Sequence, residues 1–290
     1  MVINQSLRQL YQKYASQDGT LAIIVVEKAN VPLTITDGFD VIILLVKSDA
    51  NHSWDIQHYM LENKTISFHS LTIEKVYHSL LLGNHRRLID WIVNGEIVFD
   101  RNECLRKIKE RIDTLPEGDR QKKLTIQFSK LLRRFEEGKT FFREGHYFDS
   151  YNHMMHALHH LARLSVVNQG IYSEIAVWEL VKKIDPPIYK LYQELFYSNE
   201  SVEKRIELLL LATELAIQSK IEIGTQHFFY VLHKMSRALT MNELMQIEEF
   251  STYQVDLELL VSHLVDKRKL KVEEREVGSS GYKQFFYFVD

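Results

Sequence analysis

Two continuously apolar, β-branched segments near the N-terminus constrain this fold most. Residues 21–26 (LAIIVV) and 41–46 (VIILLV) contain no polar side chain. Runs of this length are typical of strands buried on both faces of a sheet, and they are far too short to cross a bilayer. The loop between them ends in Asp37-Gly38-Phe39-Asp40. We therefore expect a buried sheet whose second strand follows an aspartate-containing turn.

Further elements are expected on both sides of these strands. Residues 1–17 form an amphipathic pattern and lack the apolar core of a signal peptide. Residues 54–62 and 65–70 are expected to pair as a hairpin around Asn63-Lys64. Residues 72–93 follow as one helix that ends at Asn94-Gly95, and residues 96–100 form a short strand.

This order of elements resembles the small nucleotidyltransferase domain of the polymerase-β type. That family carries Gly-Ser after its first strand, Asp-x-Asp at the start of the next, and a third carboxylate on a neighbouring strand. Side chains at i and i+2 of a strand share one face. Two such carboxylates can bridge a pair of Mg²⁺ ions that clamp the reacting oxygens of phosphoryl transfer.

The sequence departs from each of these motifs. Glu27-Lys28 stands in the Gly-Ser place, and Ile42 occupies the second aspartate position after Asp40. Where the third carboxylate is expected, the chain has Ser67 and His69.

Two interpretations of the eroded motif stay open. In the first, Asp40 and Asp37 hold Mg²⁺, with His69 or Glu62 as further ligands, and Lys28 contacts the phosphates of a nucleoside triphosphate; Mg²⁺ often takes only one or two carboxylates plus substrate phosphates. In the second, the domain is degenerate, and Asp37 and Gly38 are ordinary turn residues.

A helical bundle is expected over residues 114–239. Residues 114–117 (TLPE) read as a capping box, and helices are predicted at 122–143, 148–168, 173–184, 188–197, 201–219 and 225–238. Residues 119–170 carry nine Lys/Arg against five Asp/Glu. This net charge of +4 could steer a triphosphate or an RNA backbone, or it could be a solvated helix face.

A row of histidines marks the second of these helices. His153, His156 and His160 recur at i, i+3 and i+7 and share a face, so they either chelate a metal or are packed and solvated histidines. The segment 151–164 resembles the helical partner domains of kanamycin-nucleotidyltransferase and HEPN proteins. The Arg-to-His spacing of HEPN ribonucleases is absent after Arg163, which disfavours that nuclease activity.

The last fifty residues resemble a winged helix-turn-helix. Residues 240–243 (TMNE) form a capping box, a helix follows at 251–264, and residues 267–274 and 283–289 flank a Gly-Ser-Ser-Gly turn. This region has six Lys/Arg against ten Asp/Glu, a net charge of −4. Because DNA affinity depends on phosphate neutralisation by Lys and Arg, the charge argues against DNA and favours a protein partner.

The whole layout resembles a group of uncharacterised bacterial nucleotidyltransferase-like proteins of Gram-positive origin, carried by residues 36–46, 91–101, 157–166 and 201–211. The predicted fold is α+β and helix-dominated, with a nucleotidyltransferase-like mixed sheet (1–113), a central helical bundle (114–239) and a C-terminal winged helix (240–290). The resemblance implies nucleotidyl transfer or nucleotide binding. The alternatives are an inactive scaffold that binds proteins and a transcription-associated DNA binder. The lone Cys104 fits a reducing cytoplasm, and no membrane association is expected.

Overall fold

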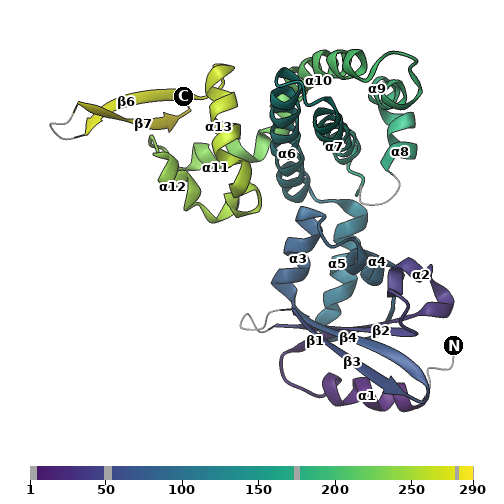
Figure 1. Cartoon of the computed structure of the whole chain (residues 1–290). Coiled ribbons are helices and arrows are strands. Elements are labelled where there is room, and N and C mark those ends of the chain that lie inside the picture. Colours follow the sequence, from purple (N-terminus) through teal and green to yellow (C-terminus); the bar gives the residue numbers. More distant parts are fainter. Residues whose placement is uncertain (1–4, 49–53, 173–176, 278–280, 290) are drawn as a thin grey trace. The chain divides into compact units, whose positions relative to one another are not determined.

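The computed structural model describes residues 5–48, 54–172, 177–277 and 281–289. It confirms the predicted helix-dominated α+β class (Figure 1). The chain divides into two compact units, residues 1–114 and residues 115–290. The first contains a mixed sheet with flanking helices, and the second contains the helical bundle and the winged helix.

The first unit is built around five strands. Its elements, in chain order, are α1 (Gln5–Ala15), β1 (Thr20–Glu27), η1 (Lys28–Asn30), α2 (Leu33–Thr36), β2 (Val41–Lys47), β3 (Asp55–Leu61), β4 (Lys64–Thr72), α3 (Ile73–Leu82), α4 (Arg86–Asn94), β5 (Glu96–Asp100), η2 (Arg101–Glu103) and α5 (Cys104–Thr114). The strand order is β3-β4-β2-β1-β5. Only β2 and β4 run parallel; the other neighbours are antiparallel.

The two apolar segments are the central strands, and both faces of the sheet are covered. One face packs against Leu7 and Tyr11 of α1 through Ile23, Ile43 and Phe68. The opposite face carries Ile42 and His69 and lies on the side of α3 and α4, which contact β4 and β1 (Figure 1). Burial on both faces explains why β1 and β2 lack the usual alternation of apolar and polar residues.

The single helix predicted over residues 72–93 is two helices. α3 ends at Gly83, whose φ of +64° suits a residue without a Cβ atom, and α4 begins after His85. Because the helix breaks here, residues 84–87 line a cavity together with residues of the sheet.

Helices make up most of the second unit. The bundle contains α6 (Glu117–Arg143), α7 (Tyr147–Asn168), α8 (Val177–Ile184), α9 (Pro186–Tyr197) and α10 (Val202–Gly224). α6 and α7 form its most extensive contact. Gly138 lets them approach closely, because a Cβ atom there would lie 3.0 Å from Met154 Sδ.

The C-terminal elements confirm the winged helix. They are α11 (Gln226–Lys234), α12 (Met241–Met245), η3 (Glu248–Asp256), α13 (Leu257–Asp266), β6 (Lys271–Val277) and β7 (Tyr282–Phe288). An isolated β-bridge between Leu239 and Tyr287 joins the segment before α12 to β7. No helix in the described ranges is both long enough and apolar enough to span a membrane.

One of the two predicted capping boxes is present. Thr240 and Glu243 bond each other's backbone N–H groups at the start of α12, as predicted. The box at Thr114 is wrong: Thr114 is the last residue of α5, its hydroxyl donates to the Glu110 carbonyl oxygen, and Pro116 precedes α6 without a side-chain cap.

Candidate functional site

A cavity of about 620 Å³ opens over the α4 side of the sheet in the first unit. We call it the N-terminal pocket. Ile42, Ser67 and His69 form its floor, since β2 and β4 place Ile42 beside Ser67 in adjacent strands. These are the positions where the resemblance places the second and third metal-binding carboxylates. The pocket therefore lies where the resemblance predicts metal-binding carboxylates, and its floor offers a hydroxyl, an imidazole and an apolar side chain instead.

Aromatic rings line the pocket on two sides. Phe39 contacts His58 with ring centroids 4.6 Å apart. On the other side, Trp54 contacts His85 at 4.9 Å, and His69 contacts Trp91 at 4.5 Å. All six side chains line the cavity. Such faces accept flat heterocycles by stacking.

His69 is a neutral hydrogen-bonding group in this arrangement. The indole N–H of Trp54 donates to Nδ1 of His69 over 3.1 Å, and Nε2 lies 2.9 Å from the Ser67 hydroxyl. Because Nδ1 accepts, the neutral ring carries its proton on Nε2, and that N–H donates to Ser67. Burial, reinforced by His58, lowers the pKa of His69 to about 4.

Cationic and polar groups gather where α4 begins. Asn84, Arg86 and Arg87 line the pocket, and Arg87 forms an ion pair with Asp37. The Thr36 hydroxyl is buried in the pocket wall and has no hydrogen-bond partner among the described residues. A bound ligand could supply that partner, since buried polar groups are normally hydrogen-bonded.

Asp40 serves as a structural acceptor between two strands. Its Oδ2 accepts from the Thr65 backbone N–H at 2.8 Å and from the Thr65 hydroxyl at 2.9 Å. These bonds, led by the backbone one, hold the pKa of Asp40 below its usual value. Lys28 Nζ lies 3.9 Å from Asp40 Oδ1 and donates to the Gly38 carbonyl oxygen at 3.4 Å. Neither Asp40 nor Lys28 is among the residues that line the pocket.

The side chains present do not fit a two-metal Mg²⁺ site. Asp37 is paired with Arg87, Asp40 is held by Thr65 and Lys28, and the second motif position is the buried Ile42. Within the described residues no group of three or more His, Cys, Asp or Glu side chains could hold a metal ion. We derive no step through a metal, and the magnesium and nucleoside triphosphate assignments stay predictions.

The histidine row of α7 is engaged with protein groups. His153 Nδ1 lies 3.0 Å from Glu137, and His160 Nδ1 lies 2.9 Å from the Gln127 side-chain oxygen. Burial and nearby cations, Lys130 foremost among them, lower the pKa of His160 to about 3. Burial and then Arg134 lower the pKa of His156.

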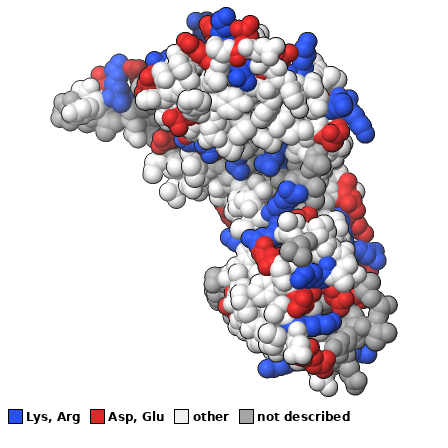
Figure 2. Space-filling view, turned by 45° about the vertical axis from the view of Figure 1, so that its right-hand side comes forward, with Lys and Arg blue, Asp and Glu red and all other residues white. Residues whose placement is uncertain are grey.

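The helix that precedes the wing, α13, has an acidic exposed face. Glu258, Ser262 and Asp266 are exposed at i, i+4 and i+8 on α13. On the wing, Arg275 pairs with Glu273 and Lys283 pairs with Glu274. On the face of the molecule shown in Figure 2, blue and red side chains are interspersed. Neither surface offers the unopposed positive charge that duplex DNA attracts.

Comparisons with known proteins agree with this three-part layout. Family models match residues 3–120 as "Nucleotidyltransferase-like", residues 121–220 as "YgxA-like substrate binding domain" and residues 226–289 as "Helix-turn-helix domain". The Bacillus subtilis (strain 168) protein with the printed name "Uncharacterized protein YgxA" is 40% identical over 97% of this chain and 96% of its own length. The crystal structure of a nucleotidyltransferase-like protein from Exiguobacterium sibiricum 255-15 matches with a TM-score of 0.88 and 37% identity, over 98% of each chain.

The fold and the family models thus define a nucleotidyltransferase-like protein with a helical domain and a helix-turn-helix domain, which confirms the predicted resemblance. The chain belongs to the family of nucleotidyltransferase-like proteins that includes YgxA.

Most of the aromatic and cationic residues that line the N-terminal pocket belong to no motif in the sequence. The sequence pattern predicts Trp54 as part of a strand, and it predicts Trp91 and the run Asn84-His85-Arg86-Arg87 as parts of one long helix. The sequence signal for this run is Gly83. It interrupts the apolar periodicity of the predicted helix, and the four residues that follow it are all polar.

Proposed function

We propose that the first unit binds a nucleotide in the N-terminal pocket without a carboxylate-held metal, and that the protein acts as a ligand-binding regulator. The observation that carries this proposal is the pairing of aromatic walls with an arginine-lined end in one cavity. A volume of about 620 Å³ is within the range of small-molecule sites.

Each part of a nucleotide has a complementary group in the pocket. A base can stack against Phe39 or Trp54, because every base has a flat π-face. Arg87 pairs with Asp37, and Arg86 Nε lies 3.8 Å from Asp90 Oδ2, but each guanidinium has five N–H donors and keeps some for phosphate oxygens. The helix dipole at the start of α4 also favours an anion there. The Thr36 hydroxyl and the Asn84 amide can bond the ribose or the base edge.

Metal-dependent nucleotidyl transfer is the competing function for the first unit. It needs Asp40 and Asp37 free to hold Mg²⁺, whereas each carboxylate has a cationic side chain beside it. The helix-turn-helix match raises duplex DNA as a partner of the C-terminal domain, and the acidic face of α13 weighs against it.

Tryptophan fluorescence gives a direct test of the nucleotide proposal. The chain has three tryptophans, and Trp178→Phe leaves Trp54 and Trp91, both in the pocket, as the reporters. We expect saturable changes on adding nucleoside triphosphates. Arg86→Ala is expected to weaken binding about tenfold, as the loss of a charge-assisted hydrogen bond does.

Arg8→Ala is the matched control. Arg8 is an exposed arginine of α1, which covers the other face of the sheet, so its removal should leave the affinity unchanged. Fluorescence that stays constant up to millimolar concentrations of all four nucleotides would reject the proposal. If Arg86→Ala and Arg8→Ala weakened nucleotide binding equally, the binding would be non-specific electrostatic attraction, and the proposed site would be rejected.

A further inference from the structure

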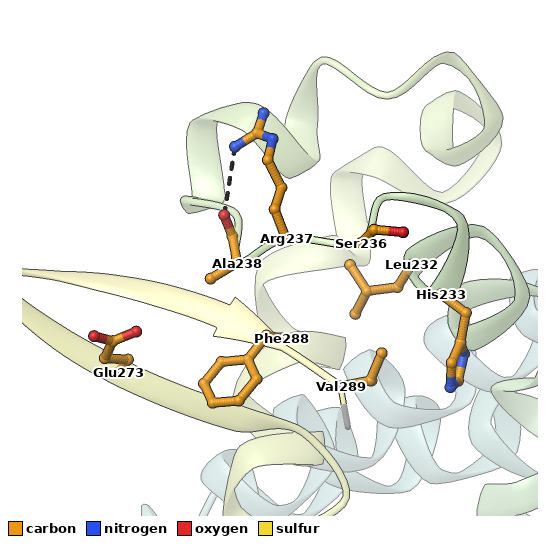
Figure 3. Close-up of a pocket in the computed structure, with 8 residues that line it drawn as sticks. All are labelled: Leu232, His233, Ser236, Arg237, Ala238, Glu273, Phe288 and Val289. Carbon is orange, nitrogen blue, oxygen red and sulfur yellow. Dashed lines mark hydrogen bonds between the residues drawn. The ribbon is translucent and has the colours of Figure 1, made fainter.

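A second cleft lies in the second unit, between α11 and the base of the wing. Two cavities of about 670 Å³ and about 330 Å³ share His233, Phe288 and Val289. Figure 3 shows the smaller one, with Leu232 of α11 opposite Phe288 and Val289 at the end of β7. We call both together the wing-base cleft. It is made from residues of both the bundle and the winged helix.

Aromatic and amide side chains line the larger cavity. Phe229, Tyr230 and Phe288 contribute rings, and Gln121 and Gln226 contribute amides. Tyr230 is 56% exposed, and Lys234 Nζ lies 4.0 Å from its ring centroid. A stacked base would cover that exposed ring surface.

The rim of the cleft is basic. Arg268, Lys269 and Lys271 come from the segment directly after α13, and the single acid that lines the larger cavity is Glu222, which lies 3.1 Å from Lys269. Arg268 forms no ion pair with any described residue. Four of the six Lys/Arg residues of the acidic C-terminal region fall within residues 267–271, so the positive charge of that region concentrates here.

We propose that the wing-base cleft binds single-stranded nucleic acid, with a base on Tyr230 and Phe229 and phosphates along Arg268, Lys269 and Lys271. Basic residues with exposed aromatic rings are the combination that holds single strands without sequence preference. Helix-turn-helix proteins that bind duplex DNA place a helix in the major groove, and the acidic exposed face of α13 would repel the phosphates there. The wing-base cleft is lined by other residues, so it can bind a single strand without α13 entering a groove. This site is independent of the N-terminal pocket.

Fluorescence anisotropy with the full chain tests the proposal. The probes are a labelled oligouridylate and a labelled oligothymidylate of about twelve nucleotides, with a duplex DNA of mixed sequence as comparison. Tyr230→Ala is expected to weaken single-strand binding about tenfold. Arg268→Asn keeps a residue that tolerates the φ of +55° found there, and it should lower the slope of log K against log salt by about 0.7, the value of one phosphate contact.

The matched control is Lys190→Ala, which removes an exposed cation of α9 outside the cleft. It should leave affinity and salt slope unchanged, and the far-ultraviolet circular dichroism of every variant should match the parent chain. Three results would overturn the proposal. These are no binding of either single strand at low salt, equal losses in Lys190→Ala and Arg268→Asn, and tighter binding of the duplex that is insensitive to Tyr230→Ala.

Discussion

Protonation of His69 should destabilise the first unit by an amount that the structure lets us calculate. Its Nδ1 accepts from Trp54 and is almost fully enclosed, with 7% of the residue exposed, so a proton there breaks the bond and buries a charge. The pKa is about 4 in the folded protein and about 6.5 in the unfolded chain. Between these values the unfolded chain binds more protons, so stability falls as the pH falls.

The linkage relation gives the size of the effect. From pH 7 to pH 5 the free energy of unfolding should drop by about 2 kcal/mol through His69 alone, and the loss should level off below pH 4, where both states are protonated. His69→Gln keeps an acceptor for Trp54 but cannot titrate, so its stability should change about 2 kcal/mol less over the same interval.

Urea denaturation at pH 7 and pH 5 measures this difference. It should be followed by fluorescence in the Trp178→Phe background, where Trp54 and Trp91 report the first unit. That readout matters because His160 and His227, with pKa values lowered by burial to about 3 and about 4, add a pH dependence of their own to the second unit. Identical pH dependence in the parent chain and His69→Gln would refute the assignment of His69 as a buried neutral acceptor.

Three further predictions follow from single contacts. Asp40→Ala should leave nucleotide affinity unchanged but lower stability at pH 7. The gap from the parent should close as the pH falls below 3.8, the ordinary pKa of the carboxyl, because the bonds from Thr65 hold the pKa of Asp40 below that value; urea denaturation at several pH values checks this. Gly224→Ala places a Cβ atom 2.4 Å from Phe128 Cγ and should cost about 1–3 kcal/mol in thermal unfolding, whereas Gly118→Ala meets nothing within 4 Å and should cost nothing. Glu258→Lys combined with Asp266→Lys should raise the affinity for duplex DNA about tenfold at low salt in an anisotropy titration, and unchanged affinity would show that α13 does not face the duplex.

The sequence predicted those parts of the fold that depend on local patterns. The runs at 21–26 and 41–46 are the central strands because only a doubly covered sheet buries so many β-branched residues in sequence. The break at Gly83 was missed because apolar periodicity continues on both sides of it. The box at Thr114 failed because α5 extends through that residue, so its hydroxyl bonds the preceding helical turn.

The candidate site was harder to predict because its residues meet only through tertiary structure. Asp40 matches a motif position, but its partner is Thr65, 25 residues away along the chain. The Trp91 indole N–H donates to the Ile35 carbonyl oxygen, 56 residues away, and this bond links α4 to α2. No local pattern predicts such pairs. Of the residues that the sequence motif predicts as the site, Asp37 lines the pocket beside its aromatic walls and arginines, whereas Asp40 and Lys28 do not line it.

Isothermal titration of the full chain with each nucleoside triphosphate, once with excess Mg²⁺ and once with EDTA, tests the central claim most directly. We predict a saturable affinity that differs by less than about threefold between the two conditions, because the groups assigned to phosphate are arginines and helix N–H groups. We also predict that Asp40→Ala binds as the parent does. Binding that requires Mg²⁺ and disappears in Asp40→Ala would contradict the account and restore the carboxylate-held metal site.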